Sequence, residues 1–215
     1  MTKPSLPKKG MDPQSVLERL EAQRRKDVDW KGGKTFSLVY YAGEQVMQLL
    51  HDAYSMFMAE NGLSPMAFPS LKQMENEVVA MTANLLHGGD GAAGSMTSGG
   101  TESIFMAMKT AREWCRKNKP NVPKPKIVAP VSAHPAFVKS AYFLDMQIEL
   151  TPLGEDWRAD PEAIKAAIDD DTAILVGSAI CYPYGVVDPI EDIAGIADAH
   201  GILMHVDGCL GGFML

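Results

Sequence analysis

Short apolar runs alternate with amphipathic helical patterns through the second half of the chain, and this alternation constrains the fold more than any other feature. The expected elements, in order, are a helix over 101–117, a strand over 126–130, a helix from 135, a strand over 147–150, a helix from 161, a strand over 173–178, a helix over 189–200 and a strand over 202–206. Strands that alternate with helices form βαβ units. We therefore predict an α/β fold with a mostly parallel sheet and helices on both of its faces.

The first part of the chain has a purely helical pattern. Asp12-Pro13 is typical of an N-cap followed by proline at the first helical position. A second helix is expected over about 43–60, and Ser70 and Gln73 predict a capping box at the start of a third. We predict a helical N-terminal segment over 1–88 and the first, incomplete part of a large α/β domain over 89–215. Because the chain stops just past a strand, leaving a sheet edge unpaired, we expect it to be part of a longer protein.

Composition excludes several classes of protein. The 215 residues carry a formal net charge of −7, whereas a nucleic-acid binder needs clustered positive charge. No stretch approaches the roughly 18–20 apolar residues of a membrane span, and the basic start, residues 1–10, lacks the apolar core of a signal peptide. The three widely spaced cysteines (115, 181 and 209) suit a reducing compartment. We expect a cytoplasmic protein.

Two glycine-rich stretches could approach a ligand closely. Gly89, Gly91 and Gly94 match the dinucleotide fingerprint, but they follow a helix instead of a strand, so a flexible connection is favoured. The stretch 97–103 directly precedes a helix, where free N–H groups and the helix dipole form an anion site. From the residues alone, a phosphate cradle and a simple helix cap made by Ser98 or Thr101 remain equally good interpretations.

Further polar residues follow the expected strands. Alternation places His205 and Asp207 on one face of the last strand. They could hold a metal together with Cys209, Asp207 could pair with a cationic group of a cofactor, or both could be satisfied within the fold. His134 and Ser178 likewise follow strands, and each alone could be only a loop or turn residue.

The 97–103 loop, His134, Ser178 and Asp207 support a ligand site more strongly together than singly, because the carboxyl ends of parallel strands share one edge of a sheet. A pocket there would combine an anion site, a ring partner and a carboxylate, which are the parts that pyridoxal 5'-phosphate needs. A carboxylate close to the ring nitrogen favours its protonated form. We expect this cofactor and no metal.

Four motifs resemble those of the sphingosine-1-phosphate lyases, within the pyridoxal-phosphate decarboxylase group. They are TSGGTESI at 97–104, SAH at 132–134, YGVVDP at 184–189 and HVDGCLGGF at 205–213. The resemblance extends from about Trp30 to Leu215. It implies the aspartate-aminotransferase-like (type I) fold and a homodimer with shared active sites.

The resemblance also implies residue roles. Gly99, Gly100 and Thr101 would bind the cofactor phosphate, Asp207 would pair with the ring nitrogen and Ser178 would lie close to the cofactor. His134 would be a catalytic residue that stacks on the ring. Tyr40, as a catalytic residue, and Asn61 match positions near the substrate, contributed across the dimer. Where the family usually has His, this chain has Ser64, so recognition of the substrate's polar end is expected to differ. The family's Schiff-base lysine follows a His beyond the end of this chain, and none of the lysines present follows a His.

The implied reaction is the cleavage of a phosphorylated sphingoid base to a long-chain aldehyde and phosphoethanolamine. The closest rival is an amino-acid decarboxylase, which uses the same cofactor site. A third possibility is an inactive homologue or fragment that acts only through dimerisation.

Overall fold

The chain forms two compact units, and the division between them falls within one helix. The structure is a computed structural model that describes residues 5–35 and 39–214. One unit extends to Met74 and the other begins at Glu75, so helix α3 (Pro69–Leu85) crosses the division. The predicted domain boundary after residue 88 stays a prediction. No helix among the described residues is long and apolar enough to cross a membrane.

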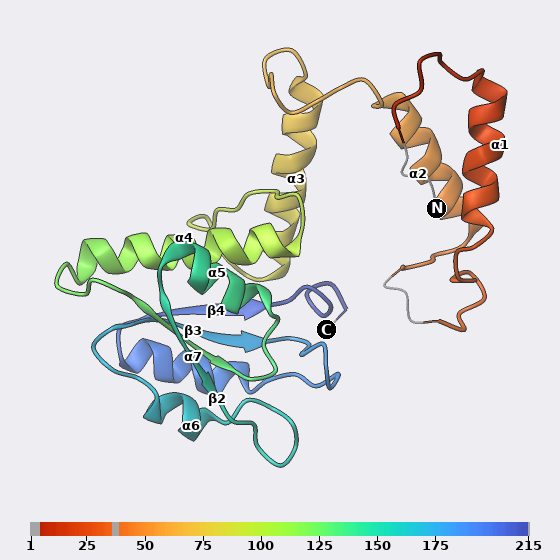
Figure 1. Cartoon of the computed structure of the whole chain (residues 1–215). Coiled ribbons are helices and arrows are strands. Elements are labelled where there is room, and N and C mark those ends of the chain that lie inside the picture. Colours follow the sequence, from red (N-terminus) through yellow and green to blue (C-terminus); the bar gives the residue numbers. More distant parts are fainter. Residues whose placement is uncertain (1–4, 36–38, 215) are drawn as a thin grey trace. The chain divides into compact units, whose positions relative to one another are not determined.

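The first unit contains α1 (Pro13–Arg24), α2 (Glu44–Met56) and the start of α3 (Figure 1). The predicted N-cap of α1 is confirmed: an Asp12 side-chain oxygen accepts the Ser15 N–H at 2.9 Å. The predicted capping box of α3 is wrong. The helix already begins at Pro69, whose fixed φ suits a first helical position, so Ser70 lies inside the first turn. None of α1, α2 and α3 contains a buried residue.

The second unit has the predicted alternation of helices and strands. In chain order, its further elements are α4 (Gly100–Asn118), β1 (Lys126–Pro130), α5 (Ala136–Leu144), β2 (Gln147–Thr151), α6 (Pro161–Ala166), β3 (Thr172–Ser178), α7 (Ile190–Ala199) and β4 (Leu203–Asp207). The sequence-based bounds agree with these to within one or two residues at most ends. Asp160 caps α6 by accepting the N–H groups of Glu162 and Ala163.

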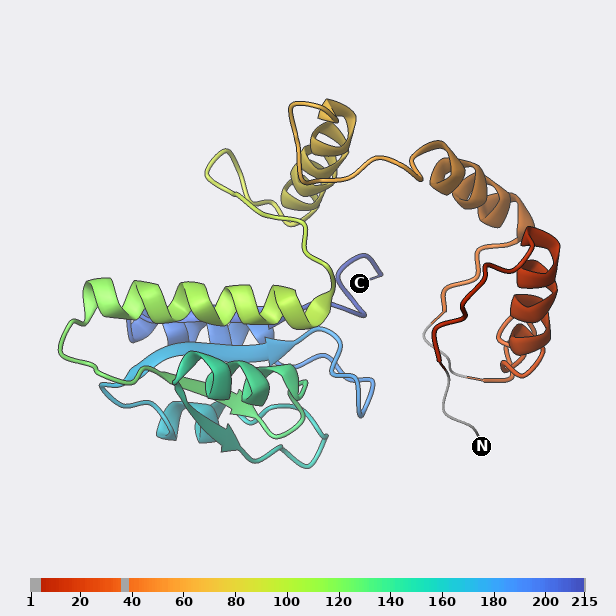
Figure 2. The ribbon, with the colours of Figure 1, turned by 45° about the horizontal axis from the view of Figure 1, so that its top comes forward.

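The four strands form one parallel sheet in the order β2-β1-β3-β4, which confirms the predicted fold class. Every residue of the central strand β3 is buried, as its apolar sequence requires in a sheet covered on both faces. All four strands point the same way, so their carboxyl ends lie at a single edge of the sheet, visible from the arrowheads in Figure 2.

Alternate strand residues contribute to two separate cores. Ile127, Ala129, Ile174 and Val176 pack against α4 and α5 in one cluster. Val128 and Leu175, pointing the other way, pack against α6 and α7 in the second. This alternation is the period-two geometry of a strand, and it fixes the sheet as a layer between two pairs of helices (Figure 1).

A buried lysine stabilises the opposite, amino-terminal edge of the sheet. Lys126, whose side chain is 8% exposed, begins β1, and its Nζ lies 2.8 Å from Glu149 and 2.7 Å from Asp169. The same Nζ donates to the Ala167 carbonyl at 2.7 Å. Burial lowers the pKa of Lys126, but the two carboxylates outweigh burial and raise the pKa overall. This cluster ties β1 to β2 and to the turn before β3.

Candidate active site

The carboxyl ends of β3 and β4 bring two of the predicted residues side by side. Ser178, the last residue of β3, is the register partner of Asp207, the last residue of β4. The Ala179 N–H continues the ladder by donating to the Asp207 carbonyl at 2.9 Å. Ser178 is 3% exposed, whereas Asp207 is only partly buried. The hydroxyl and the carboxylate therefore stand on adjacent strands at the edge where parallel sheets bind ligands.

The N-terminus of α4 lies next to the loop after β4. A side-chain carbon added at Gly100 would be 3.8 Å from the Cys209 sulfur. The N-cap is Gly99, and no side chain caps the helix, so the interpretation of Ser98 or Thr101 as a cap is wrong. Among the described residues, nothing accepts the N–H groups of Gly100 and Thr101. They remain free for an anion, which the helix dipole also favours.

Ser98 has a different partner from the one the sequence suggested. Its N–H and its hydroxyl both donate to one oxygen of Glu102, each at 2.6 Å. These hydrogen bonds lower the pKa of the exposed Glu102 carboxyl. The Thr97 hydroxyl similarly pairs with that of Ser103 at 2.6 Å. The loop before α4 is thus held by local side-chain bonds, which leave the N–H groups of Gly100 and Thr101 open.

The loop after β1 carries His134 and approaches the loop after β3. The exposed His134 accepts the Ala136 N–H on Nδ1 at 3.1 Å, so in the neutral ring the proton is on Nε2. The buried Cys181 thiol lies 4.0 Å from the Ser132 carbonyl, which joins the two loops. The Ser132 hydroxyl is buried and has no hydrogen-bond partner in the described part of the chain.

Asp207 and His205 have different surroundings. One oxygen of Asp207 accepts the Cys209 N–H at 3.0 Å, and the other has no hydrogen-bond partner among the described residues. His205 lies edge-on to Phe137, with ring centroids 5.6 Å apart, and burial lowers its pKa against the opposing effect of Asp207. No group of three metal-ligating side chains occurs within residues 5–35 and 39–214, so the metal interpretation of His205, Asp207 and Cys209 finds no support there.

The three predicted substrate-side residues lie in the other, helical unit. Tyr40 is 68% exposed. Asn61 accepts the Leu63 N–H on its side-chain oxygen at 3.1 Å, which is an ordinary turn contact. The Ser64 carbonyl accepts the N–H groups of Ala67 and Phe68 just before α3. Their arrangement around a substrate stays a prediction.

Sequence reasoning missed Asp188 as a residue of this edge. Asp188 is 2% exposed, and its carboxylate accepts the Ser178 N–H at 2.8 Å. The Asp-Pro pairs at 12–13 and 160–161 are helix caps, and Asp188-Pro189 looks the same in sequence. Here the N-cap is Pro189, and the aspartate binds β3 instead. The YGVVDP motif at 184–189 drew attention to this segment. The residues next to Asp188 in the chain, however, do not show which groups its side chain binds.

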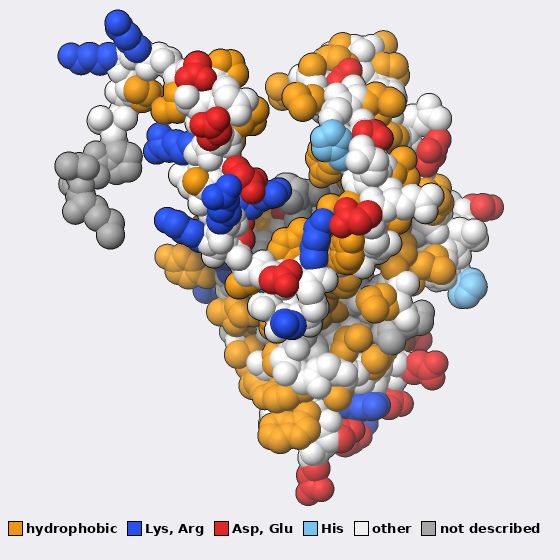
Figure 3. Space-filling view, turned by 90° about the vertical axis from the view of Figure 1, so that its right-hand side faces the viewer, with side chains coloured by type: hydrophobic (Ala, Val, Ile, Leu, Met, Phe, Trp, Pro, Cys, Tyr) orange, Lys and Arg blue, Asp and Glu red, His pale blue; other side chains and the backbone are white. Residues whose placement is uncertain are grey.

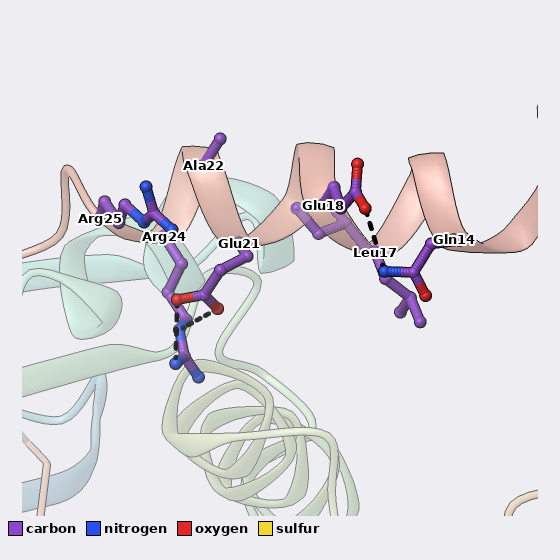
Figure 4. Close-up of a pocket in the computed structure, with 8 residues that line it drawn as sticks. Gln14, Leu17, Glu18, Glu21, Ala22, Arg24 and Arg25 are labelled. Carbon is purple, nitrogen blue, oxygen red and sulfur yellow. Dashed lines mark hydrogen bonds and ion pairs between the residues drawn. The ribbon is translucent and has the colours of Figure 1, made fainter.

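A hollow on the surface of α1 is of a different kind (Figure 4). Gln14, Leu17, Glu18, Glu21 and Arg24 line it, all from one exposed helix. Gln14 pairs with Glu18, and Glu21 with Arg24, so its polar groups bind each other. This hollow is lined by a single helix, whereas the carboxyl edge of the sheet brings together segments that are distant in sequence.

The fold and the edge together define the class: an α/β protein whose free helix N-terminus suits a phosphate-bearing ligand. Comparison with known proteins identifies the family. The pyridoxal-dependent decarboxylase conserved domain matches residues 2–215, and the chain belongs to that family. The predicted resemblance and the type I fold are both confirmed.

Individual relatives include several sphingosine-1-phosphate lyases. Sphingosine-1-phosphate lyase 1 of Mus musculus is 42% identical over 98% of this chain, and the lyase of Dictyostelium discoideum is 39% identical over 98%. The solved structure of the sphingosine-1-phosphate lyase Bpss2021 of Burkholderia pseudomallei K96243 superposes on 99% of the chain with a TM-score of 0.92 and 37% identity. The chain spans 37% and 40% of the two curated relatives and 51% of the solved one.

The residues at the edge fit the family's cofactor, pyridoxal 5'-phosphate. The open N–H groups at the start of α4 suit its phosphate. The free oxygen of Asp207 suits a protonated ring nitrogen. The partnerless Ser132 hydroxyl is a further polar group at this edge that lacks a hydrogen bond within the described chain.

Proposed function

We propose that a protein containing this chain is a pyridoxal-phosphate-dependent lyase that cleaves a phosphorylated sphingoid base to a long-chain aldehyde and phosphoethanolamine. The observation that carries the proposal is the likeness to the Burkholderia lyase over nearly the whole chain, at 37% identity and a TM-score of 0.92. The chain spans about half of that enzyme and a smaller share of the mouse relative. The proposed activity is therefore that of a whole protein containing this chain.

At the cofactor, we assign the phosphate to the backbone of Gly99, Gly100 and Thr101, whose uncapped position supports this role. His134 lies against the ring and presents Nε2–H, since Nδ1 already accepts a backbone bond. Ser178 adds a hydroxyl close to the cofactor. When bound, the cofactor supplies an electron sink for the pair released as the carbon–carbon bond breaks.

Asp207 has the largest effect on rate in this assignment. Its free oxygen holds the proton on the ring nitrogen, and its other oxygen is fixed by the Cys209 N–H. The phosphate contacts bind the cofactor equally before and during the reaction, whereas the proton on the nitrogen matters most as negative charge develops. Affinity and turnover should therefore depend on different residues.

On the substrate side, we assign Tyr40, as a catalytic residue, and Asn61 and Ser64, as substrate contacts, to the site of a second copy. The proposed assembly is a homodimer with shared active sites. Its support is the apolar surface of the helical unit, where α1 and α2 bury no residue and Leu17, Leu20, Leu49 and Tyr54 are each more than half exposed. Hydrophobic side chains are also abundant on the face drawn in Figure 3. Apolar side chains that are exposed together on neighbouring turns of a helix favour an interaction site.

The dimer is tested by sedimentation of the wild-type chain and of Leu49→Lys, which places a charge on the exposed face of α2. We expect a concentration-dependent dimer that the substitution weakens. Gln48→Lys adds the same charge at the neighbouring polar position and should leave the dimer intact. A wild-type chain that stays monomeric at high concentration would overturn the assignment of a shared site.

The reaction is tested by supplying sphinganine 1-phosphate and a panel of amino acids to the protein containing this chain, with aldehyde and carbon dioxide measured separately. Aldehyde supports the lyase. Carbon dioxide without aldehyde would establish the rival decarboxylase. The absence of both products, with an intact dimer, would favour a protein that acts only through dimerisation.

Substitutions at the edge separate affinity from turnover. Asp207→Ala should lower turnover on the order of a thousandfold, because the ring nitrogen loses its proton, with a smaller change in cofactor affinity. Thr101→Ala should show the opposite balance. Near-normal turnover of the Asp207→Ala variant would show that Asp207 has only a structural role.

Ser64 bears on substrate choice. Its hydroxyl carries no charge, whereas a protonated imidazole would form a charge-assisted bond to phosphate, roughly twice as strong as a neutral one. Ser64→His should lower KM for the phosphorylated substrate. An unchanged KM would show that this position does not contact the phosphate.

We also propose a cytoplasmic location. The three cysteines support it, since all are free in the structure and two of them, Cys115 and Cys181, are buried thiols. Fractionation of cells that express the protein would test it. Recovery of the protein with an oxidising compartment would overturn the proposal.

A further inference from the structure

A single buried carboxylate ties together three segments beside the candidate site. Asp188 lies between β3 and α7 and is 2% exposed. One of its oxygens accepts the Ser178 N–H at 2.8 Å, and the other accepts the Ala159 N–H at 2.9 Å. Its own N–H donates to the Ser178 carbonyl at 3.0 Å. Ser178 is therefore bound to Asp188 on both sides of its backbone.

The carboxylate has no cationic partner among the ion pairs of the described residues. Its burial is compensated by two backbone N–H donors. A buried carboxylate is costly unless such bonds satisfy it, so a position of this kind tolerates little displacement. Any shift of Asp188 would leave a buried N–H or a buried oxygen unpaired.

The bonds of Asp188 reach the cofactor edge through one residue. Ser178 pairs in register with Asp207, and the next residue, Ala179, donates to the Asp207 carbonyl at 2.9 Å. The position of Ser178 along β3 thus also fixes the position of the Asp207 backbone on the neighbouring strand. Asp188 itself is assigned no contact with the cofactor.

We propose that Asp188 is a positioning residue for the cofactor site, which holds the Ser178 hydroxyl and the end of β4 in the geometry that binds pyridoxal phosphate. This inference rests on the proposed function, because it needs the cofactor to lie at this edge. It assigns a task to the aspartate of the YGVVDP motif that is separate from those of Asp207 and the helix N-terminus.

The substitution Asp188→Asn tests this with little change of shape. An amide offers one acceptor oxygen where the carboxylate offers two, so one of the two N–H groups would face an amide NH2. Leaving a buried donor unpaired weakens the link to Ser178 or to Ala159 without removing a core side chain.

The experiment measures pyridoxal 5'-phosphate binding to the 215-residue chain by absorbance titration, together with the induced circular dichroism of the bound cofactor at saturation and the melting temperature. We expect Asp188→Asn to raise the Kd about tenfold and to change the induced signal at saturation. Ser178→Ala should change that signal in the same way.

Two control variants separate positioning from stability. Ile164→Val weakens the α6–α7 core, where Ile164 is fully buried, and should lower the melting temperature while leaving Kd and the induced signal unchanged. Asp192→Asn removes an exposed charge in the first turn of α7 and should change neither the melting temperature nor cofactor binding.

The possible failures are distinguishable. If Asp188→Asn melts lower but binds with the parental Kd and signal, Asp188 is only structural and the inference is overturned, with the proposed function intact. If Ile164→Val disturbs binding equally, general destabilisation explains the effect, and the inference again fails. If the parent chain shows no saturable binding, the proposed cofactor site itself fails, and the inference with it.

Discussion

The helical unit and the α/β unit use their apolar side chains in different ways. In the helical unit, α1 and α2 bury nothing, and leucines such as Leu17 and Leu49 are 61% and 67% exposed. In the α/β unit, residues such as Phe137 and Leu175 are fully buried between the sheet and its helices. Within the described residues, the α/β unit buries its apolar side chains in two cores, whereas the helical unit leaves those of α1 and α2 at least partly exposed.

The difference shows which part of the candidate site is already formed. The cofactor edge belongs to the α/β unit, where strand pairing and two cores fix its residues. The residues proposed for the substrate side, Tyr40, Asn61 and Ser64, belong to the helical unit, whose helices contain no buried residue. We expect cofactor affinity to be a property of the single chain and substrate recognition to depend on assembly.

The largest expected difference between the units is in their response to the loss of an apolar side chain. Phe137→Ala should lower the free energy of unfolding by about 3–5 kcal/mol, because it leaves a cavity in the core. Leu49→Ala should change it by about 0.5 kcal/mol or less in dilute, monomeric protein. Denaturant unfolding monitored by circular dichroism measures both. A comparable cost for the two variants would break the comparison, since the helical unit would then have its own core.

A matched pair of lysines gives the next largest difference. Lys126→Met removes a buried ammonium from Glu149, Asp169 and the Ala167 carbonyl, and should lower the free energy of unfolding by about 1–3 kcal/mol. Lys31→Met removes an exposed ion pair with Glu44 in the helical unit and should have no measurable effect. The same unfolding assay applies. If the two substitutions cost the same, the lysine cluster does not stabilise the sheet.

The smallest effect expected is a pH dependence of stability that arises from a buried histidine of the α/β unit. Burial lowers the pKa of His205 in the folded protein, so below about pH 6.5 the unfolded state binds more protons than the folded state. The free energy of unfolding should therefore fall as the pH drops from about 7 through this range. His205→Gln should make that slope shallower.

The control for this prediction is His51→Gln, which changes an exposed histidine on α2. It should leave the slope as in the wild type. Unfolding free energies measured at a series of pH values between about 5 and 8 decide the question. A parental slope in His205→Gln would show that the burial of His205 is not what makes stability depend on pH.

The sequence by itself determined the elements, their order and the fold class. Period-two and period-3.6 patterns, with caps such as Asp12 and Asp160, reflect interactions between residues close in the chain, and these are readable locally. It also placed Ser178 and Asp207 at strand ends and His134 in the loop after a strand, and the parallel sheet brings the carboxyl ends of its strands to one edge. The family followed from motifs in the correct order along the chain.

Only the tertiary structure decided which polar groups are occupied and which are free. Ser98 was a candidate cap, yet its hydroxyl binds Glu102, and the start of α4 is left open. Asp188 had the sequence of a helix cap, yet it accepts N–H groups from Ser178 and from Ala159, 29 residues away. The physical reason is that a side chain's choice between a local and a distant partner depends on the burial and geometry that the packed sheet creates. Neither is encoded in the spacing of residues along the chain.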